Sequence, residues 1–130
     1  MGDPGHLDPA HLDLAHFADL LATQRAEREA EAEALSASLS DVRAARSDGT
    51  ADDEHDPEGS TLSSDWSRIS GLLGALRSRI EAIDRAAERI DAGTYGICLR
   101  RGERISLDRL EVLPAAELCI ACAREAEARR

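Results

Sequence analysis

Three cysteines near the C-terminal end of this 130-residue chain are the residues whose type and spacing best predict chemistry. Cys119 and Cys122 form a complete C-x2-C pair, whereas Cys98 is followed at the matching position by Arg101. Seventeen residues separate the two pairs, which is a spacing typical of four-cysteine zinc sites. The pattern predicts a zinc knuckle with Cys98, Cys119 and Cys122 as ligands and with Arg101, which is not a ligand, at the second position.

The missing fourth ligand leaves several interpretations open. Three thiolates hold zinc when another ligand or a water completes the tetrahedron. No histidine follows His55, so Glu103 and Asp108 are the candidate substitutes. Alternatively, Arg101 pairs with a thiolate or a nearby acid and replaces part of the metal's charge.

The composition favours helices that pack in a thin seam. Hydrophobic residues make up 42% of the chain but aromatic residues only 2%, so alanine and leucine supply most of the apolar surface. Residues 1–92 carry twenty acids and nine arginines, net −11, while residues 93–130 carry six acids and seven arginines, net +1. Such a chain is a poor candidate for direct DNA binding, and a basic surface on a protein partner suits it better.

No apolar run reaches the roughly 20 residues that span a bilayer, and no signal peptide is evident, so we expect a cytoplasmic protein without a membrane partner.

Two long helices are predicted before the cysteines. The first covers about residues 13–46, although polar side chains interrupt its apolar face. A loop or frayed helix end is expected over 47–64, where Gly, Pro and small polar residues gather, and Ser64 or Asp65 is expected to cap the second helix. The second helix then carries the strongest periodic signal, a 3-then-4 stripe of apolar residues that ends before Gly93. The stripe consists of Trp66, Ile69, Leu73, Leu76, Ile80, Ile83, Ala87 and Ile90.

The segment after Gly93 is too short to bury much core of its own, so we expect it to need a metal or to dock onto the helices. Alternation over 105–107 and 110–112 predicts a small irregular ribbon, and Pro114 is expected to begin a last helix running towards Arg130. The fold class is therefore mainly α: a long antiparallel helical hairpin, or coiled coil, with a small zinc-ribbon-like knuckle and a terminal helix. Its parts are a disordered N-terminus (1–12), a hairpin (13–92) with an acidic tip (47–64), and a degenerate zinc finger with the C-terminal helix (93–130).

Several non-cysteine residues around the knuckle form a more specific pattern. Tyr95-Gly96-x-Cys98 leads into it, Arg109-Leu110-Glu111 followed by Pro114 lies in its middle, and Leu118-Cys119-Ile120-x-Cys122 closes it. Together with the acidic hairpin, these residues resemble the DksA/TraR family of bacterial transcription regulators. The resemblance covers about residues 52–124 in detail and departs from the family's four-cysteine site at Arg101.

The resemblance implies a regulator that binds RNA polymerase, inserts the hairpin into the secondary channel and modulates initiation through the acidic tip. It also implies zinc as cofactor. Guanosine tetraphosphate is a further ligand of the polymerase complex in some members of the family, and no residue here decides whether it matters for this chain. The family's pair of tip aspartates carries over to Asp53 and Asp56, with Asp52, Glu54 and Glu58 as alternatives in register.

Two other classes of function stay open. The chain can be a helical-hairpin interaction module with a structural knuckle and a partner other than polymerase. It can also be a redox-sensing protein that uses Cys119 and Cys122 as a dithiol, although no thioredoxin-like βαβ pattern surrounds them. An enzyme is not expected, because the sequence has neither a phosphate-binding glycine loop nor a recognisable catalytic set.

Overall fold

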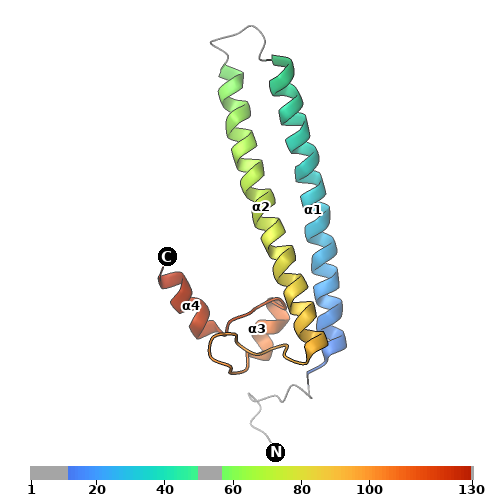
Figure 1. Cartoon of the computed structure of the whole chain (residues 1–130), viewed down its shortest axis with the longest axis vertical. Helices are drawn as coiled ribbons and strands as arrows, with labels where there is room; N and C mark the ends of the chain where they lie inside the picture. The colour runs from blue at the N-terminus through green and yellow to red at the C-terminus, as the bar shows by residue number, and fades with distance from the viewer. Residues whose placement is uncertain (1–11, 50–56, 130) are drawn as a thin grey trace, which may run out of the picture. The chain divides into compact units, whose positions relative to one another are not determined.

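The computed structural model describes residues 12–49 and 57–129, without the side chains of residues 48, 49 and 57–60. Its four helices are α1 (Leu14–Gly49), α2 (Pro57–Ala92), α3 (Leu107–Val112) and α4 (Ile120–Ala128). No strand occurs within the described residues (Figure 1). An isolated antiparallel bridge joins Ile97 to Arg104. The mainly helical fold class is thereby confirmed.

The chain divides into two compact units. The first comprises residues 1–25 and 81–130, and the second comprises residues 26–80. Within each unit, the parts of α1 and α2 lie side by side and run in opposite directions (Figure 1). None of the described helices is long and apolar enough to cross a membrane.

Both long helices extend further than the sequence predicts. At its start, α1 is capped by Asp13, whose carboxylate accepts a hydrogen bond from the backbone N–H of His16 at 3.1 Å. The predicted loop over 47–64 is too long, because α1 continues to Gly49 and α2 begins at Pro57. Proline suits the first position of a helix, where its missing N–H costs nothing, so neither Ser64 nor Asp65 is the cap.

The apolar stripe of α2 is confirmed with one change of register. Ile69, Leu73 and Leu76 are buried in the second unit and Ile83 in the first, as the 3-then-4 spacing predicts. Ala86 is fully buried, however, and Ala87 is exposed, so the prediction of Ala87 as a core residue is wrong. Two adjacent alanines look alike to a periodicity argument, and only the neighbours that pack against them decide which one is buried.

The first unit joins the cysteine-bearing segment to the base of the two long helices. Its core unites apolar side chains of α1 and α2 with residues of the C-terminal segment. The core consists of Phe17, Leu21, Ile83, Ala86, Tyr95, Cys98, Ile105, Leu110 and Cys122. Leu12 packs against it, which corrects the prediction of disorder at that position, while residues 1–11 of the predicted disordered segment lie outside the described residues. Docking onto the helices, expected because the segment is short, is therefore observed.

Two predictions for the C-terminal segment are wrong. Residues 107–112 form helix α3 instead of part of a ribbon, because the Ser106 hydroxyl caps it by accepting a hydrogen bond from the N–H of Arg109 at 3.2 Å. The last helix begins at Ile120, not at Pro114, and Cys119 is its N-cap residue. Alternation over three residues is too short a signal to separate a strand from one turn of helix.

Candidate metal centre

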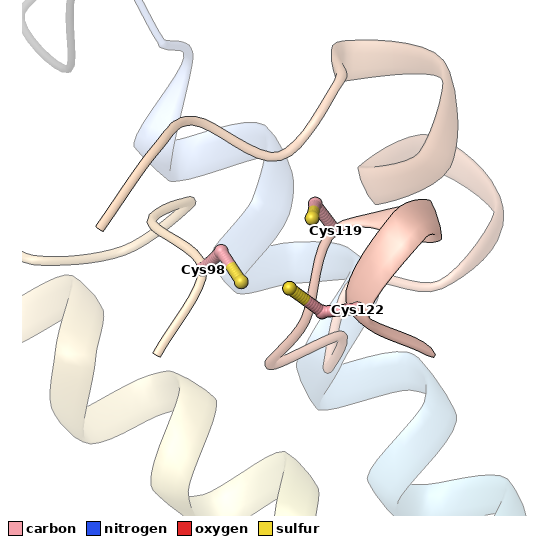
Figure 2. Close-up of side chains that lie close together, drawn as sticks. All are labelled: Cys98, Cys119 and Cys122. Carbon is pink, nitrogen blue, oxygen red and sulfur yellow. The ribbon is translucent and has the colours of Figure 1, made fainter. Parts of the chain in front are cut away.

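The three cysteines come together in space. Their sulfur atoms lie within 4.8 Å of one another, and all three are free thiols (Figure 2). Cys98 and Cys122 are fully buried in the core of the first unit, whereas Cys119 is half-buried. Within the part of the chain that the structure describes, no His, Asp or Glu joins this group of potential ligands. Glu103 and Asp108, the substitutes considered from the sequence, are thus not part of the cluster.

A tight turn of the backbone positions Cys98. The N–H of Gly102 donates to the carbonyl of Cys98 at 2.9 Å, and the N–H of Cys98 donates to the carbonyl of Glu103 at 2.7 Å. Gly102 has a φ of 71°, which glycine adopts without the steric cost of a side chain. The turn therefore keeps its geometry although Arg101 stands in place of the second cysteine.

The second pair is positioned by α4. Cys119 precedes the helix and Cys122 lies in its first turn, so both sulfurs face the same side (Figure 2). The N–H of Ala123 donates to the carbonyl of Cys119 at 2.9 Å, which closes this turn. The loop before α4 is held to the first knuckle, since the N–H of Leu99 donates to the carbonyl of Glu117 at 2.9 Å.

The thiols differ in acidity. Burial by itself would raise the pKa of Cys98, but backbone N–H groups of Cys119, Arg101 and Arg100 and the thiol of Cys122 donate to its sulfur and lower the pKa to about 6. The pKa of Cys122 is raised to about 11 by burial and by its hydrogen bonds to the other two sulfurs. The thiolate form of Cys98 is thus stabilised, and it accepts a hydrogen bond from the thiol of Cys122. A metal ion bound by the three sulfurs would displace the remaining thiol protons.

This donor set fits zinc. Thiolate sulfur is a preferred ligand of zinc, and each of the two turns offers its sulfur at a site that backbone hydrogen bonds hold in place. A bound zinc ion would cross-link the turn that carries Cys98 to the turn that carries Cys119 and Cys122. It would not supply acid–base or redox chemistry here.

The non-cysteine residues of the motif secure the segment around the cluster. The hydroxyl of Tyr95 donates to the carbonyl of Pro114 at 2.8 Å, and its ring packs 5.4 Å from that of Phe17. The Nε–H of Arg109 donates to the carbonyl of Leu118 at 2.9 Å, directly before the second cysteine pair. Leu110 is fully buried. The motif residues are thus structural supports of the cysteine cluster.

The alternative that Arg101 pairs with a nearby acid is confirmed, while the identity of that acid, Glu125, and the contact of His16 with Glu111 were not predicted. Glu125 accepts ion pairs from Arg100 and Arg101, at 3.3 and 3.4 Å, and it lies one turn of α4 beyond Cys122. His16 contacts Glu111 at 2.9 Å and links α1 to α3. The position of Glu125, one helical turn after Cys122, could have predicted its contact with the two arginines. No sequence pattern links His16 to Glu111, which lies 95 positions later.

Most of the acidic residues predicted for the tip lie outside the described residues. Asp52, Asp53, Glu54 and Asp56 lie outside the described residues, and of Glu58 only its position in the first turn of α2 is described. The role of these side chains therefore stays a prediction.

In the first unit, a cluster of three cysteines that fits zinc packs against parts of two antiparallel helices, which is the arrangement of a small helical protein with a candidate metal site. Residues 93–128 match the family described as the prokaryotic dksA/traR C4-type zinc finger. The solved structure of transcription factor DksA2 from Pseudomonas aeruginosa matches with a TM-score of 0.75 and 31% identity, over 95% of this chain and 92% of that one. The chain belongs to the DksA/TraR family. That family consists of transcription regulators and not of enzymes, in agreement with the expectation from the sequence.

Curated relatives match over shorter stretches. General stress protein 16O of Bacillus subtilis is 31% identical over 68 residues, 52% of this chain and 42% of the relative. The RNA polymerase-binding transcription factor DksA of Caulobacter vibrioides is 43% identical over 44 residues, 34% of this chain and 31% of the relative. The chain thus spans less than half the length of these curated relatives.

Proposed function

We propose that this chain is a cytoplasmic, non-enzymatic transcription regulator that binds RNA polymerase through the secondary channel. The observation that carries the proposal is the likeness to a DksA2 structure over nearly the whole of both chains, long helices as well as finger. A zinc-finger match alone covers only residues 93–128 and would leave the role of the helices open. The relative from Caulobacter vibrioides, whose name states polymerase binding, supports the same partner.

The second unit consists of two long helical arms, which supports the proposal of insertion into a channel. Its two helical arms, residues 26–49 and 57–80, are each roughly 36 Å long at about 1.5 Å per residue. The unit carries twelve acids and six arginines, and five of those acids lie between residues 52 and 58, where no arginine occurs. The two arms together carry eight acids and six arginines, so four of the unit's six net negative charges come from residues 52–56, between the arms in sequence.

We assign the working contacts to this acidic segment. Asp53 and Asp56 are proposed as the principal residues, with Asp52, Glu54 and Glu58 as alternatives in register. A carboxylate near the catalytic centre of polymerase would act through charge on bound metal, nucleotide or basic side chains. The proposal assigns Cys98, Cys119 and Cys122 to a zinc ion that holds the finger at the base of the hairpin, so that the finger supports the helices and does not perform the regulation.

Binding and initiation assays with bacterial RNA polymerase test the proposal. We expect the purified chain to bind polymerase and to change the yield of initiation, and we expect the Asp53→Asn/Asp56→Asn variant to bind but to lose most of this effect. A matched control is Glu33→Gln/Asp41→Asn, which removes two charges from exposed acids of α1.

The outcomes separate the parts of the proposal. Absence of binding would overturn polymerase as the partner and favour an interaction module for a different protein. Binding with an unchanged effect of the Asp53/Asp56 variant would refute only the assignment of those residues. The same loss in the α1 control would indicate that bulk charge, not the tip, is what matters.

A further inference from the structure

Arg101 occupies the position of the missing cysteine, and its guanidinium pairs with a carboxylate on α4. Its side chain is 44% exposed, and its Nη2 lies 3.4 Å from Oε1 of Glu125 on α4. Arg100 contacts the other oxygen of the same carboxylate at 3.3 Å. A guanidinium stays protonated and has no lone pair to offer, so Arg101 cannot serve as the fourth ligand.

The rest of the described chain does not supply that ligand either. The three sulfurs form a group that no His, Asp or Glu of the described residues joins. Three protein ligands with an unfilled fourth position are the arrangement by which proteins keep a zinc ion open to an outside ligand, whereas closed structural sites use four. Cys98 and Cys122 are buried, so approach from solvent is on the side of the half-buried Cys119.

The charges near the cluster lower the cost of placing an anion at the open position. A zinc ion with three thiolates carries a net charge of about −1, as the formal charges add. Arg100 and Arg101 share one carboxylate, that of Glu125, so these three side chains carry a net charge of +1, which balances the −1 of the metal and its three thiolates. Such a charge offsets part of the cost of bringing a further anion close.

We propose that the three-cysteine centre keeps the fourth position of its metal open and that this position takes a small thiol from solution. The sulfur of that thiol would stand where the missing cysteine stands in a four-cysteine finger, and Arg100 and Arg101 would stabilise its charge. The thiol gives its proton to solvent on binding, and nothing is oxidised or reduced. The proposal rests on the cysteine cluster and not on polymerase binding, so either can fail without the other.

Cobalt(II) in place of zinc makes the fourth ligand visible. The full-length chain is loaded with cobalt(II) without oxygen, and its visible absorption bands are followed while 2-mercaptoethanol is added. We expect the bands to shift to a saturable end point that matches the Arg101→Cys variant, whose four cysteines already provide four sulfurs. Ethylene glycol, the oxygen analogue, should leave the spectrum of the wild-type chain unchanged.

Two variants test the open position further through their spectral response to 2-mercaptoethanol. A purely structural knuckle would not show the differences expected between them. Arg101→Cys should bind cobalt and show no response to 2-mercaptoethanol, since its fourth position is filled. Arg100→Ala should keep the response but need a roughly two- to fivefold higher thiol concentration for half-saturation, the range expected for one exposed charge. Circular dichroism of each variant verifies that the helices are intact.

Three results would overturn the proposal. A wild-type spectrum that thiol does not change means that the position is already filled, and sensitivity gained in Glu125→Gln, Glu103→Gln or Asp108→Asn would then identify the chain's own ligand. Loss of cobalt to the thiol means that three cysteines do not hold the metal. An equal response in Arg101→Cys means that the thiol acts somewhere other than at the fourth position.

Discussion

At the scale of single residues, the finger is held by side chains that reach across the chain. Tyr95 and Arg109 each donate a hydrogen bond to a backbone carbonyl of the loop that leads to the second cysteine pair. His16 and Glu111 add a contact between the first turn of α1 and α3. Because these donors are side chains that bind backbone carbonyls, they set the path of the loop as well as stabilise it.

The His16 contact gives the stability of the first unit a pH dependence. The hydrogen bond to Glu111 raises the pKa of His16 above its usual 6.5. The imidazolium is therefore favoured in the folded state, and its stabilising contribution is present below pH 6.5 and is lost as the pH rises through the folded-state pKa. We expect His16→Gln to lower the melting temperature at acidic pH and to have little effect at alkaline pH.

Thermal melts of the wild-type chain and the variant across this pH range provide the measurement. Glu111→Gln should reproduce the profile of His16→Gln, while Glu103→Gln, which neutralises another exposed acid of the finger, should not. A difference in melting temperature that stays constant with pH would contradict the ion pair as its cause.

At the scale of elements, α2 combines a strong apolar stripe with two glycines that the helix does not require. Gly71 and Gly74 lie within the helix with exposed backbones, and a Cβ added at either position would meet no atom within 4 Å. Gly93 directly after the helix is different, because its φ of 76° lies in the left-handed region. The same residue type thus weakens the helix at two positions and terminates it at a third.

Alanine at the two helical glycines should stabilise the second unit. Each of Gly71→Ala and Gly74→Ala is expected to add about 0.5–1 kcal/mol to the free energy of unfolding, because alanine loses less backbone entropy on folding. Urea denaturation measures the change. The control is Gly93→Ala, which also meets open space but should cost roughly 1–2 kcal/mol because of its positive φ. Destabilisation by Gly71→Ala would show that the helix surface there is engaged in a contact.

At the scale of the whole molecule, metal and negative charge belong to different units. The cysteine cluster is part of the core of the first unit, and the acids of residues 52–58 belong to the second. Stabilisation by the metal should therefore act on the first unit, because two of the three sulfurs are core residues there.

Removal of zinc should have a local effect. In the zinc-loaded chain, a chelator is expected to speed amide hydrogen exchange in peptides from residues 93–128 and to leave exchange in residues 26–80 nearly unchanged. Mass spectrometry of the labelled peptides gives the measurement, with the same chelator saturated by zinc as the control. Equal acceleration in both units would refute the local role, and no acceleration anywhere would refute zinc as a support of the fold.

The sequence by itself determined the features that depend on local order: two long helices, the buried stripe of α2, the end of α2 before Gly93 and the spacing of the cysteine pairs. Periodicity and glycine conformations act over a few residues, so they can be identified without a structure. Only the tertiary structure decided that α3 replaces a ribbon, that Ala86 is buried instead of Ala87, and that Arg101 turns to Glu125. These outcomes depend on which distant segments pack together, and for the cysteines that packing leaves three sulfurs together without a fourth ligand among the described residues.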